Sequence, residues 1–115
     1  IKKADAEIDW QQTAEQVDRV VRTFNPSPGA FTYFQDNLLK IWQVSVVNGR
    51  VGQPGEIIAA DRDGIIVACG SGLLRIEVMQ KPGGKKLNAA DYLSGNSMQP
   101  GEYFAAINHS SFEHD

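Results

Sequence analysis

Three lysines lie beside two glycines in the segment 81–86, and this segment holds the best candidates for binding chemistry in the sequence. Lys81, Lys85 and Lys86 flank Gly83 and Gly84. Small residues let a phosphate group approach the backbone closely, and lysine ammonium groups bind phosphate oxygens. A solubilising loop between a strand and a helix has the same composition. Composition alone leaves both interpretations open.

Two arginines form a second candidate pair. Arg19 and Arg22 lie three positions apart on the polar side of a predicted helix, where Asp18 and Arg22 also have the i, i+4 spacing of an ion pair. An ordinary solvated ion-pair face explains this pattern. Contact with phosphate explains it too, because the planar guanidinium group of arginine fits phosphate oxygens.

The other groups that could do chemistry have simpler explanations. The glycines of segment 70–72 precede a strand rather than a helix, so they indicate a tight hairpin and not a phosphate-binding loop. His109 and His114 lie in an unpatterned tail without cysteine partners, and the serines lack a histidine base on a structured element. Cys69 sits in an apolar run and is expected to be a small buried hydrophobe. We therefore expect no metal site, no bound cofactor and no catalytic residue in this chain.

Aromatic residues in the predicted strands are candidates for stacking on nucleic-acid bases. They are Phe31, Tyr33, Phe34 and Trp42. Strand aromatics belong to the core more often than to a base-stacking surface, so we expect these to be core residues. Trp10 is expected to pack against the body formed by the strands.

Size and charge bound the class of protein. The chain has 115 residues, of which 42% are hydrophobic, and this is enough for one core and too few for two. The formal net charge of -3 does not favour a nucleic-acid-binding domain, which is usually basic. No run of about eighteen apolar residues and no signal-peptide pattern is present, so we expect a soluble cytoplasmic protein without membrane contact. The chain begins with Ile1 rather than Met, and we expect it to be part of a longer protein.

One helix is predicted near the N-terminus. Thr13 and Gln16 fit a capping box, in which each side chain bonds to the backbone of the other residue. Apolar residues at helical spacing follow, namely Ala14, Val17, Val21 and Phe24. The segment 25–29 ends the helix, because one proline disfavours helical backbone at Asn25 and a second proline followed by glycine forces a turn.

From residue 30 onward the pattern is typical of short antiparallel strands with turn residues at close spacing. The predicted strands cover residues 30–34, 38–47, 56–60, 65–69 and 74–78. Asn48-Gly49 is a strong turn dipeptide after the second strand. Leu74, Ile76 and Val78 alternate with polar residues, so we expect all three to face the core.

The predicted fold class is mainly β with one N-terminal helix, built as a small OB-like antiparallel barrel in a single domain, because closure removes the unpaired edges of short hairpins. The pattern alone leaves an SH3-like barrel or a small sandwich open. Residues 81–88 are expected to form a polar loop and 89–95 one or two helical turns. We expect residues 1–12 to be a linker end with an extended segment, 13–104 the barrel domain, and 105–115 a tail that is partly disordered.

Several segments together resemble a known family. They read IDW at 8–10, RVVRTFNPSPGA at 19–30, PGEI at 54–57, DGIIV at 63–67, GSGLLRI at 70–76, QKPGGKK at 80–86 and ADYL at 90–93. A strand with Trp42 and a closing Pro100-Gly101 with Phe104 complete the pattern. The set is similar to the C-terminal domain of methionyl-tRNA formyltransferases and of their relatives that formylate amino sugars on nucleotides. The likeness extends from about residue 8 to residue 104.

The resemblance implies an OB-like barrel that helps to hold the acceptor arm of initiator Met-tRNA in translation initiation. In this family an N-terminal formyltransferase domain of the same polypeptide carries the catalytic Asn, His and Asp and binds 10-formyltetrahydrofolate, the formyl donor. The resemblance also implies that Lys81, Lys85, Lys86, Arg19 and Arg22 contact tRNA, and no cofactor is expected in this chain. The alternative is a scaffolding domain of a sugar-nucleotide N-formyltransferase without a nucleic-acid role. The glycine and lysine segment favours tRNA binding.

Overall fold

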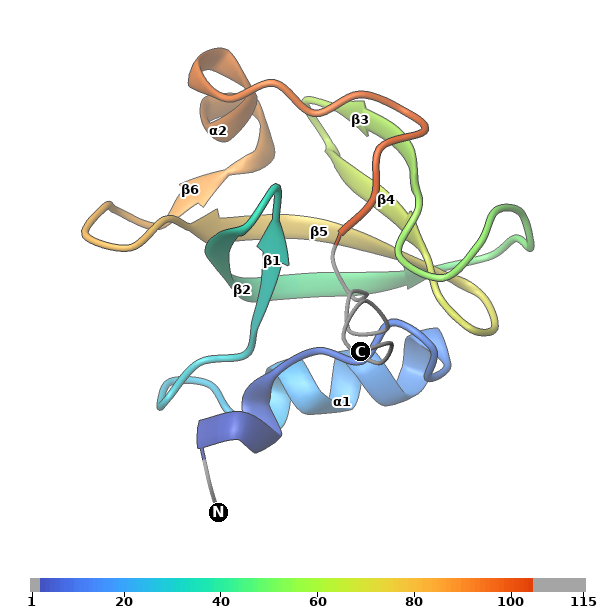
Figure 1. The fold of residues 1–115 in the computed structure, drawn as a ribbon, viewed down its shortest axis with the longest axis horizontal. Helices are drawn as coiled ribbons and strands as arrows, with labels where there is room; N and C mark the ends of the chain where they lie inside the picture. The colour runs from blue at the N-terminus through green and yellow to red at the C-terminus, as the bar shows by residue number, and fades with distance from the viewer. Residues whose placement is uncertain (1–2, 105–115) are drawn as a thin grey trace, which may run out of the picture.

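The computed structural model describes residues 3–104 (Figure 1). A short 3₁₀ helix, Lys3–Ala6, precedes two α-helices, α1 (Ala14–Thr23) and α2 (Ala89–Gly95). The strands are β1 (Phe31–Phe34), β2 (Asn37–Val47), β3 (Ile57–Asp61), β4 (Gly64–Ala68), β5 (Leu73–Gln80) and β6 (Leu87–Asn88). The prediction of a mainly β single domain is confirmed, and α2 supplies the helical turns expected at its position. The predicted tail at 105–115 lies outside the described residues.

Within residues 3–104, six antiparallel strands form one sheet in the order β1-β2-β5-β4-β3, and β6 pairs with β5. The hairpins β3–β4 and β4–β5 follow the turns that the sequence predicts. Asn48-Gly49 does not begin a hairpin, because β2 pairs with β5 and residues 48–56 cross to β3. The ladder to β5 has seven paired positions, whereas β3 has five residues in all. The turn dipeptide thus follows the end of β2 but does not join it to its partner strand.

A short closing segment, residues 101–104, joins the two outer strands of the sheet. On one side the Phe104 N–H donates to Gly55 O at 2.8 Å, next to the start of β3. On the other side Phe104 forms an antiparallel bridge with Phe34 of β1. This segment bridges the two outer strands and covers part of each open edge. The finer OB-like assignment stays a prediction.

Trp10 is the largest fully buried side chain among the described residues, and it ties three segments together. Its ring stacks on Phe104 with the two centroids 5.5 Å apart. Its indole N–H donates to the buried hydroxyl of Thr32 on β1 at 3.0 Å. Ile8 is also buried, and its N–H donates to Phe31 O at 2.8 Å. The predicted packing of Trp10 is confirmed, and the segment before α1 contributes to the same core.

Helix α1 begins at the predicted capping box. Thr13 Oγ1 accepts from the Gln16 N–H at 3.0 Å, and Gln16 Oε1 accepts from the Thr13 N–H at 2.9 Å. The buried face of the helix carries Ala14, Val17 and Val21, as predicted. Phe24 follows the helix and lies in a second apolar cluster with Ala6 and Phe31. The helix and the N-terminal segment are thus packed against each other and against β1.

Two details around β5 differ from the prediction. Val78 is only half-buried, and Met79 takes the core position instead. The β2–β5 ladder shifts register on both sides of Gln43, which pairs with Val78, so the alternation that runs through Ile76 is interrupted there. Leu87–Asn88, expected as loop, forms β6 and pairs with β5. A strand of two residues is too short to show a period of two in the sequence.

The backbone contact made by Gly70 explains why segment 70–72 begins with glycine. Its N–H donates to Gln12 O at 2.9 Å, and a Cβ at this position would overlap the carbonyl of Gln11. The β4–β5 hairpin therefore packs backbone to backbone against the segment before α1. Glycine is needed here for close approach of the chain to itself, which confirms the hairpin interpretation.

Phe24→Ala should lower the free energy of unfolding by about 3 kcal/mol, because it removes a buried aromatic ring that the neighbouring residues cannot replace. Arg19→Ala removes an exposed side chain and should change the same quantity by no more than about 0.5 kcal/mol. Urea unfolding followed by circular dichroism measures both. Equal midpoints for the two variants would contradict the register of α1.

Gly70→Ala should destabilise the fold by about 1 to 3 kcal/mol, because the added methyl group forces the backbone near Gln11 to move. Gly95→Ala is the matched control: it is the last residue of α2, and no atom lies within 4 Å of the place that its Cβ would take. This control should be neutral or stabilising by up to about 1 kcal/mol. Thermal unfolding compares the two, and a Gly70→Ala chain as stable as the parent would show that this close approach is dispensable.

Candidate nucleic-acid interface

Trp42 of β2 lies at the centre of the region where several predicted binding residues meet. The register shift leaves it without a paired residue on β5, and its half-buried side chain belongs to neither core cluster. Its indole N–H donates to Gln80 Oε1 at 2.8 Å, and Gln80 Nε2 donates to Gly84 O at 2.8 Å. The expectation that Trp42 is a core residue is wrong: Leu39 and Ile41 of β2 are buried, so Lys40 and Trp42 point to the other face of the strand. Trp42 instead anchors the loop 81–86.

Lys86 lies over the ring of Trp42. Its Nζ is 3.9 Å from the ring centroid, well within the range of cation–π attraction. The side chain is exposed, so the ammonium group still reaches solvent or an anion. The Gly84 N–H donates to Lys81 O at 2.9 Å and closes the loop as a turn. The segment that composition singles out is therefore an ordered turn held on an aromatic ring.

The proline turn, residues 25–29, docks on the same tryptophan. Asn25 Nδ2 donates to the backbone oxygen of Trp42 at 3.3 Å. Lys40 Nζ donates to Pro28 O at 2.8 Å and so connects β2 to this turn. Both the lysine loop and the end of the helix–turn unit are thus fastened to one short stretch of β2.

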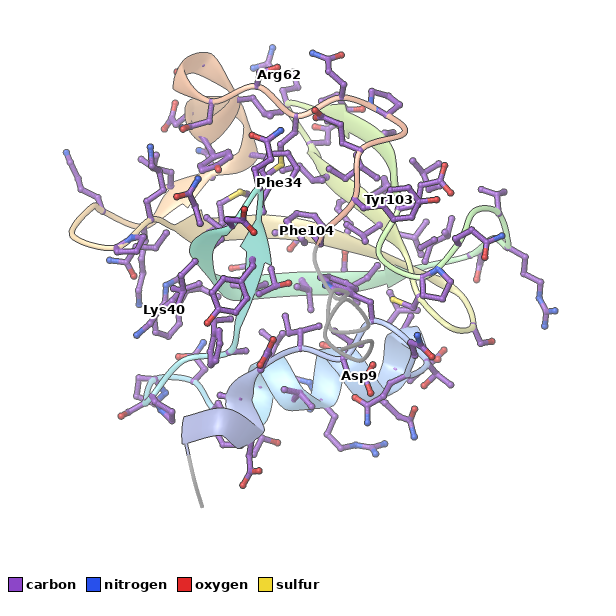
Figure 2. The ribbon with its side chains drawn as sticks, viewed as in Figure 1. Asp9, Phe34, Lys40, Arg62, Tyr103 and Phe104 are labelled. Atoms are coloured by element: carbon purple, nitrogen blue, oxygen red, sulfur yellow. The ribbon has the colours of Figure 1, made fainter. Side chains whose placement is uncertain are left out.

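Lys40 is a cation that the sequence did not single out. Its Nζ is 5.8 Å from the ring centroid of Trp42. In Figure 2 Lys40 lies on the side of the molecule that carries both the proline turn and the loop 81–86. A signal was available, because Lys40 and Trp42 are two positions apart in a predicted strand and so point to one face.

Arg22 and Arg19 lie on α1. Arg22 is in the last turn of the helix, just before the proline turn, and its Nε is 3.4 Å from Asp18 Oδ1, the ion pair that the spacing predicts. Arg19 is exposed one turn earlier. The docked turn brings the C-terminal end of α1 to the same side of β2 as the lysine loop (Figure 1).

Lys81 points away from the other predicted lysines. Its Nζ donates to Asn96 Oδ1 at 3.0 Å, and Asn96 Nδ2 donates to Tyr92 O of α2 at 2.9 Å. It lines a hollow between the β1–β2 hairpin and α2, together with Leu38 and Tyr92. Lys85, on the same loop, is exposed. Trp42 therefore holds Lys86, while α2 holds Lys81.

The charges at this surface are largely uncompensated. Among the predicted cations and Lys40, Arg22 alone forms an ion pair with a carboxylate in residues 3–104. Ionic strength of about 0.1 M screens charges beyond about 10 Å, so an anion at the surface responds mainly to nearby groups. A chain with a net charge of -3 can therefore present a locally cationic surface. Such a surface suits phosphate groups better than bases.

A comparison with known families gives the assignment. The model described as "Formyl transferase, C-terminal domain" matches residues 1–97. The chain belongs to this family. The matched range includes α1, all six strands of the described part and the cationic residues around Trp42.

Relatives of this formyl transferase C-terminal domain are much longer than the chain. The methionyl-tRNA formyltransferase of Nitrosomonas eutropha is 53% identical over 105 residues, which cover 90% of this chain and 33% of the relative. That of Geobacter metallireducens is 48% identical over 101 residues, covering 88% and 32%. The chain thus spans about a third of the length of these relatives. HypX from Aquifex aeolicus, solved in complex with tetrahydrofolic acid, shares the fold with a TM-score of 0.69 at 17% identity, over 93% of this chain and 21% of that one.

Neither a metal-binding cluster nor a membrane-spanning helix is present among the described residues. Within residues 3–104, no three His, Cys, Asp or Glu side chains gather where they could hold a metal ion. His109 and His114 lie outside the described residues. In the same range, no helix has the length and apolar character required to cross a membrane.

Cys69 is the single cysteine of the domain, and it is buried. Burial raises the pKa of its thiol from 9.0 to about 12, and the negative charge of Glu15 adds to the shift. The thiolate is the nucleophilic form, so this thiol stays protonated and unreactive near neutral pH. The expectation of a small buried hydrophobe at Cys69 is confirmed.

Cys69 should react slowly with a thiol-specific aromatic disulfide in the folded chain at mildly alkaline pH, and rapidly in urea. The pKa of this thiol is higher in the folded than in the unfolded state, so the unfolded chain loses the proton first as the pH rises. The thiol therefore lowers the free energy of unfolding progressively between pH 9.0 and about 12, and has no such effect below pH 9.0. Cys69→Ala should lack this component of the alkaline loss. Fast labelling without denaturant would contradict the burial of the thiol.

Proposed function

We propose that this chain is the tRNA-binding C-terminal domain of a methionyl-tRNA formyltransferase. Support comes from its family and from relatives that carry this name, of which it matches about a third. In this proposal an N-terminal formyltransferase domain of the same polypeptide binds 10-formyltetrahydrofolate and transfers the formyl group in the cytoplasm. The domain described above forms an OB-like barrel and helps to hold the acceptor arm of initiator Met-tRNA.

The observation that carries the proposal is the cationic surface around Trp42, in which Lys85, Lys86 and Arg22 are exposed and Lys40 is half-buried. Lys85 and Lys86 come from the loop after β5, Lys40 from β2 and Arg22 from the end of α1. The ammonium groups of Lys86 and Lys40 lie 3.9 and 5.8 Å from the Trp42 ring centroid, and Arg22 lies just before the proline turn that is bonded to Trp42. Ammonium and guanidinium groups suit the oxygens of a nucleic-acid backbone. We assign Arg19 and Lys81 to the margins of this surface as further tRNA contacts.

Contacts of this kind position an RNA and do not select its sequence. Phosphates are the same in every tRNA, so this surface holds the acceptor arm without distinguishing initiator from elongator tRNA. Holding the arm raises the effective concentration of the reacting amino group at a catalytic domain on the same polypeptide. Selection of the initiator then belongs to that catalytic domain.

The triple variant Lys81→Ala, Lys85→Ala, Lys86→Ala tests the proposal. The logarithm of affinity should fall with the logarithm of salt concentration by about 0.7 to 0.9 per phosphate neutralised, so the variant should lose roughly two to three units of slope. The loss should be equal for initiator and elongator tRNA. Affinity is measured by titration of fluorescently labelled tRNA, starting at low ionic strength. Salt then screens neither the local attraction by the lysines nor the long-range repulsion by the acidic chain, so both contribute to the measured affinity.

The control variant, Arg50→Ala with Arg62→Ala, removes two cations outside the surface around Trp42: Arg50 lies beside the turn 70–72, and Arg62 lies at the β3–β4 turn (Figure 2). Its slope should equal that of the parent chain, although its net charge is more negative. Absence of salt-dependent binding by the parent, or equal binding by the triple variant, would overturn the proposal. The domain would then be better explained as a scaffold of a sugar-nucleotide N-formyltransferase.

A further inference from the structure

We propose that Trp42 is a positioning residue for phosphate binding: it holds the Lys86 ammonium group and the turn of the lysine loop in place before RNA arrives. This inference rests on the proposed function and deepens it. It concerns a residue that reaches RNA only through another side chain. Contacts that converge on one indole ring carry it.

The ring acts first on the side chain of Lys86. A free lysine on a solvated loop samples many rotamers, and ordering it on binding costs entropy. With Nζ 3.9 Å from the ring centroid, the ammonium group is attracted to the ring face while the side chain remains exposed. Part of the ordering cost is therefore met within the free protein, which raises affinity for an anion at that place.

The indole N–H acts second, on the loop backbone. It can only donate, so the oxygen of the Gln80 amide must face it, and the amide nitrogen is left to donate to Gly84 O at 2.8 Å. Both ends of Gln80 are thus used to join Trp42 to the loop. The backbone of the turn at Gly84 is held at the same time as the lysine that follows it.

Direct stacking of a base on Trp42 is disfavoured by the same contacts. Lys86 occupies one ring face at cation–π distance. Gly29 of the proline turn lies against the ring edge, where a Cβ would come within 2.8 Å of Cη2. A base would have to displace the lysine that the ring attracts. Trp42 therefore serves RNA through Lys86 rather than as a stacking platform.

A double-mutant cycle on the whole chain tests this inference. Trp42→Leu removes both the ring and the donor, and should weaken binding of labelled tRNA about five- to tenfold at low ionic strength. Trp42→Phe keeps an aromatic face and should recover about half of that loss on a logarithmic scale. Lys86→Met keeps the stem and removes the charge. In the Lys86→Met background, Trp42→Leu should have no more than about a twofold further effect, since the two residues act as one unit.

Tyr33→Leu is the matched control, because Tyr33 is also a half-buried strand aromatic but its ring packs on Phe31 and not on Lys86. It should leave affinity unchanged. In the free chain, the Cε protons of Lys86 should show an upfield ring-current shift in NMR spectra that Trp42→Leu abolishes and Trp42→Phe retains in part. This readout does not depend on RNA, and urea midpoints identify any variant that fails to fold.

The possible outcomes separate this inference from the proposed function. If tRNA binding is salt-dependent and Lys86→Met weakens it while Trp42→Leu does not, the positioning role is refuted and the tRNA-binding domain stands. If Trp42→Leu weakens binding equally with and without the Lys86 charge, Trp42 does not act through Lys86 and the inference is again wrong. Absence of any salt-dependent tRNA binding by the parent chain defeats both.

Discussion

Trp10 stacks on Phe104 and donates its indole N–H to Thr32, and these contacts hold together three segments that lie far apart in the sequence. The ring contact between Phe34 of β1 and Phe104, and the packing of Ala6 near Phe31, join the same segments. A buried indole donor needs a partner, and Thr32 supplies it within the core. Closure of the strands and placement of α1 both follow from this arrangement, because the segment with Trp10 leads directly into the helix.

The second tryptophan has the opposite environment. Trp42 lies on the face of β2 opposite the buried Leu39 and Ile41, and its indole N–H donates to Gln80 at the surface. Its ring, carbonyl and indole N–H each hold a different element, so a loop and a helix end that differ in sequence position meet on one strand. The chain is acidic as a whole, yet cations gather at this surface. Salt screens distant charges, so an anion at the surface interacts mainly with these nearby cations.

Much of the fold was predictable because its signals are local. The capping box at Thr13, the apolar stripe of α1 and the turns of β3–β4 and β4–β5 depend on residues within a few positions of each other. The partner of β2 was not predictable in this way. A strong turn dipeptide at 48–49 suggests a local return, but the longer ladder to β5 outweighs it. Likewise, β6 exists only because β5 extends far enough to pair with two more residues.

By itself, the sequence determined which cations are candidates: the lysines of segment 81–86 and the arginines of α1 stand out by type and spacing. Only the tertiary structure decided how they are grouped. It directs Lys81 to α2, places Lys86 on Trp42 and adds Lys40 from β2. The physical reason is that a side chain's type is written in the sequence, whereas its neighbours from other elements are set by strand pairing and loop docking across tens of residues.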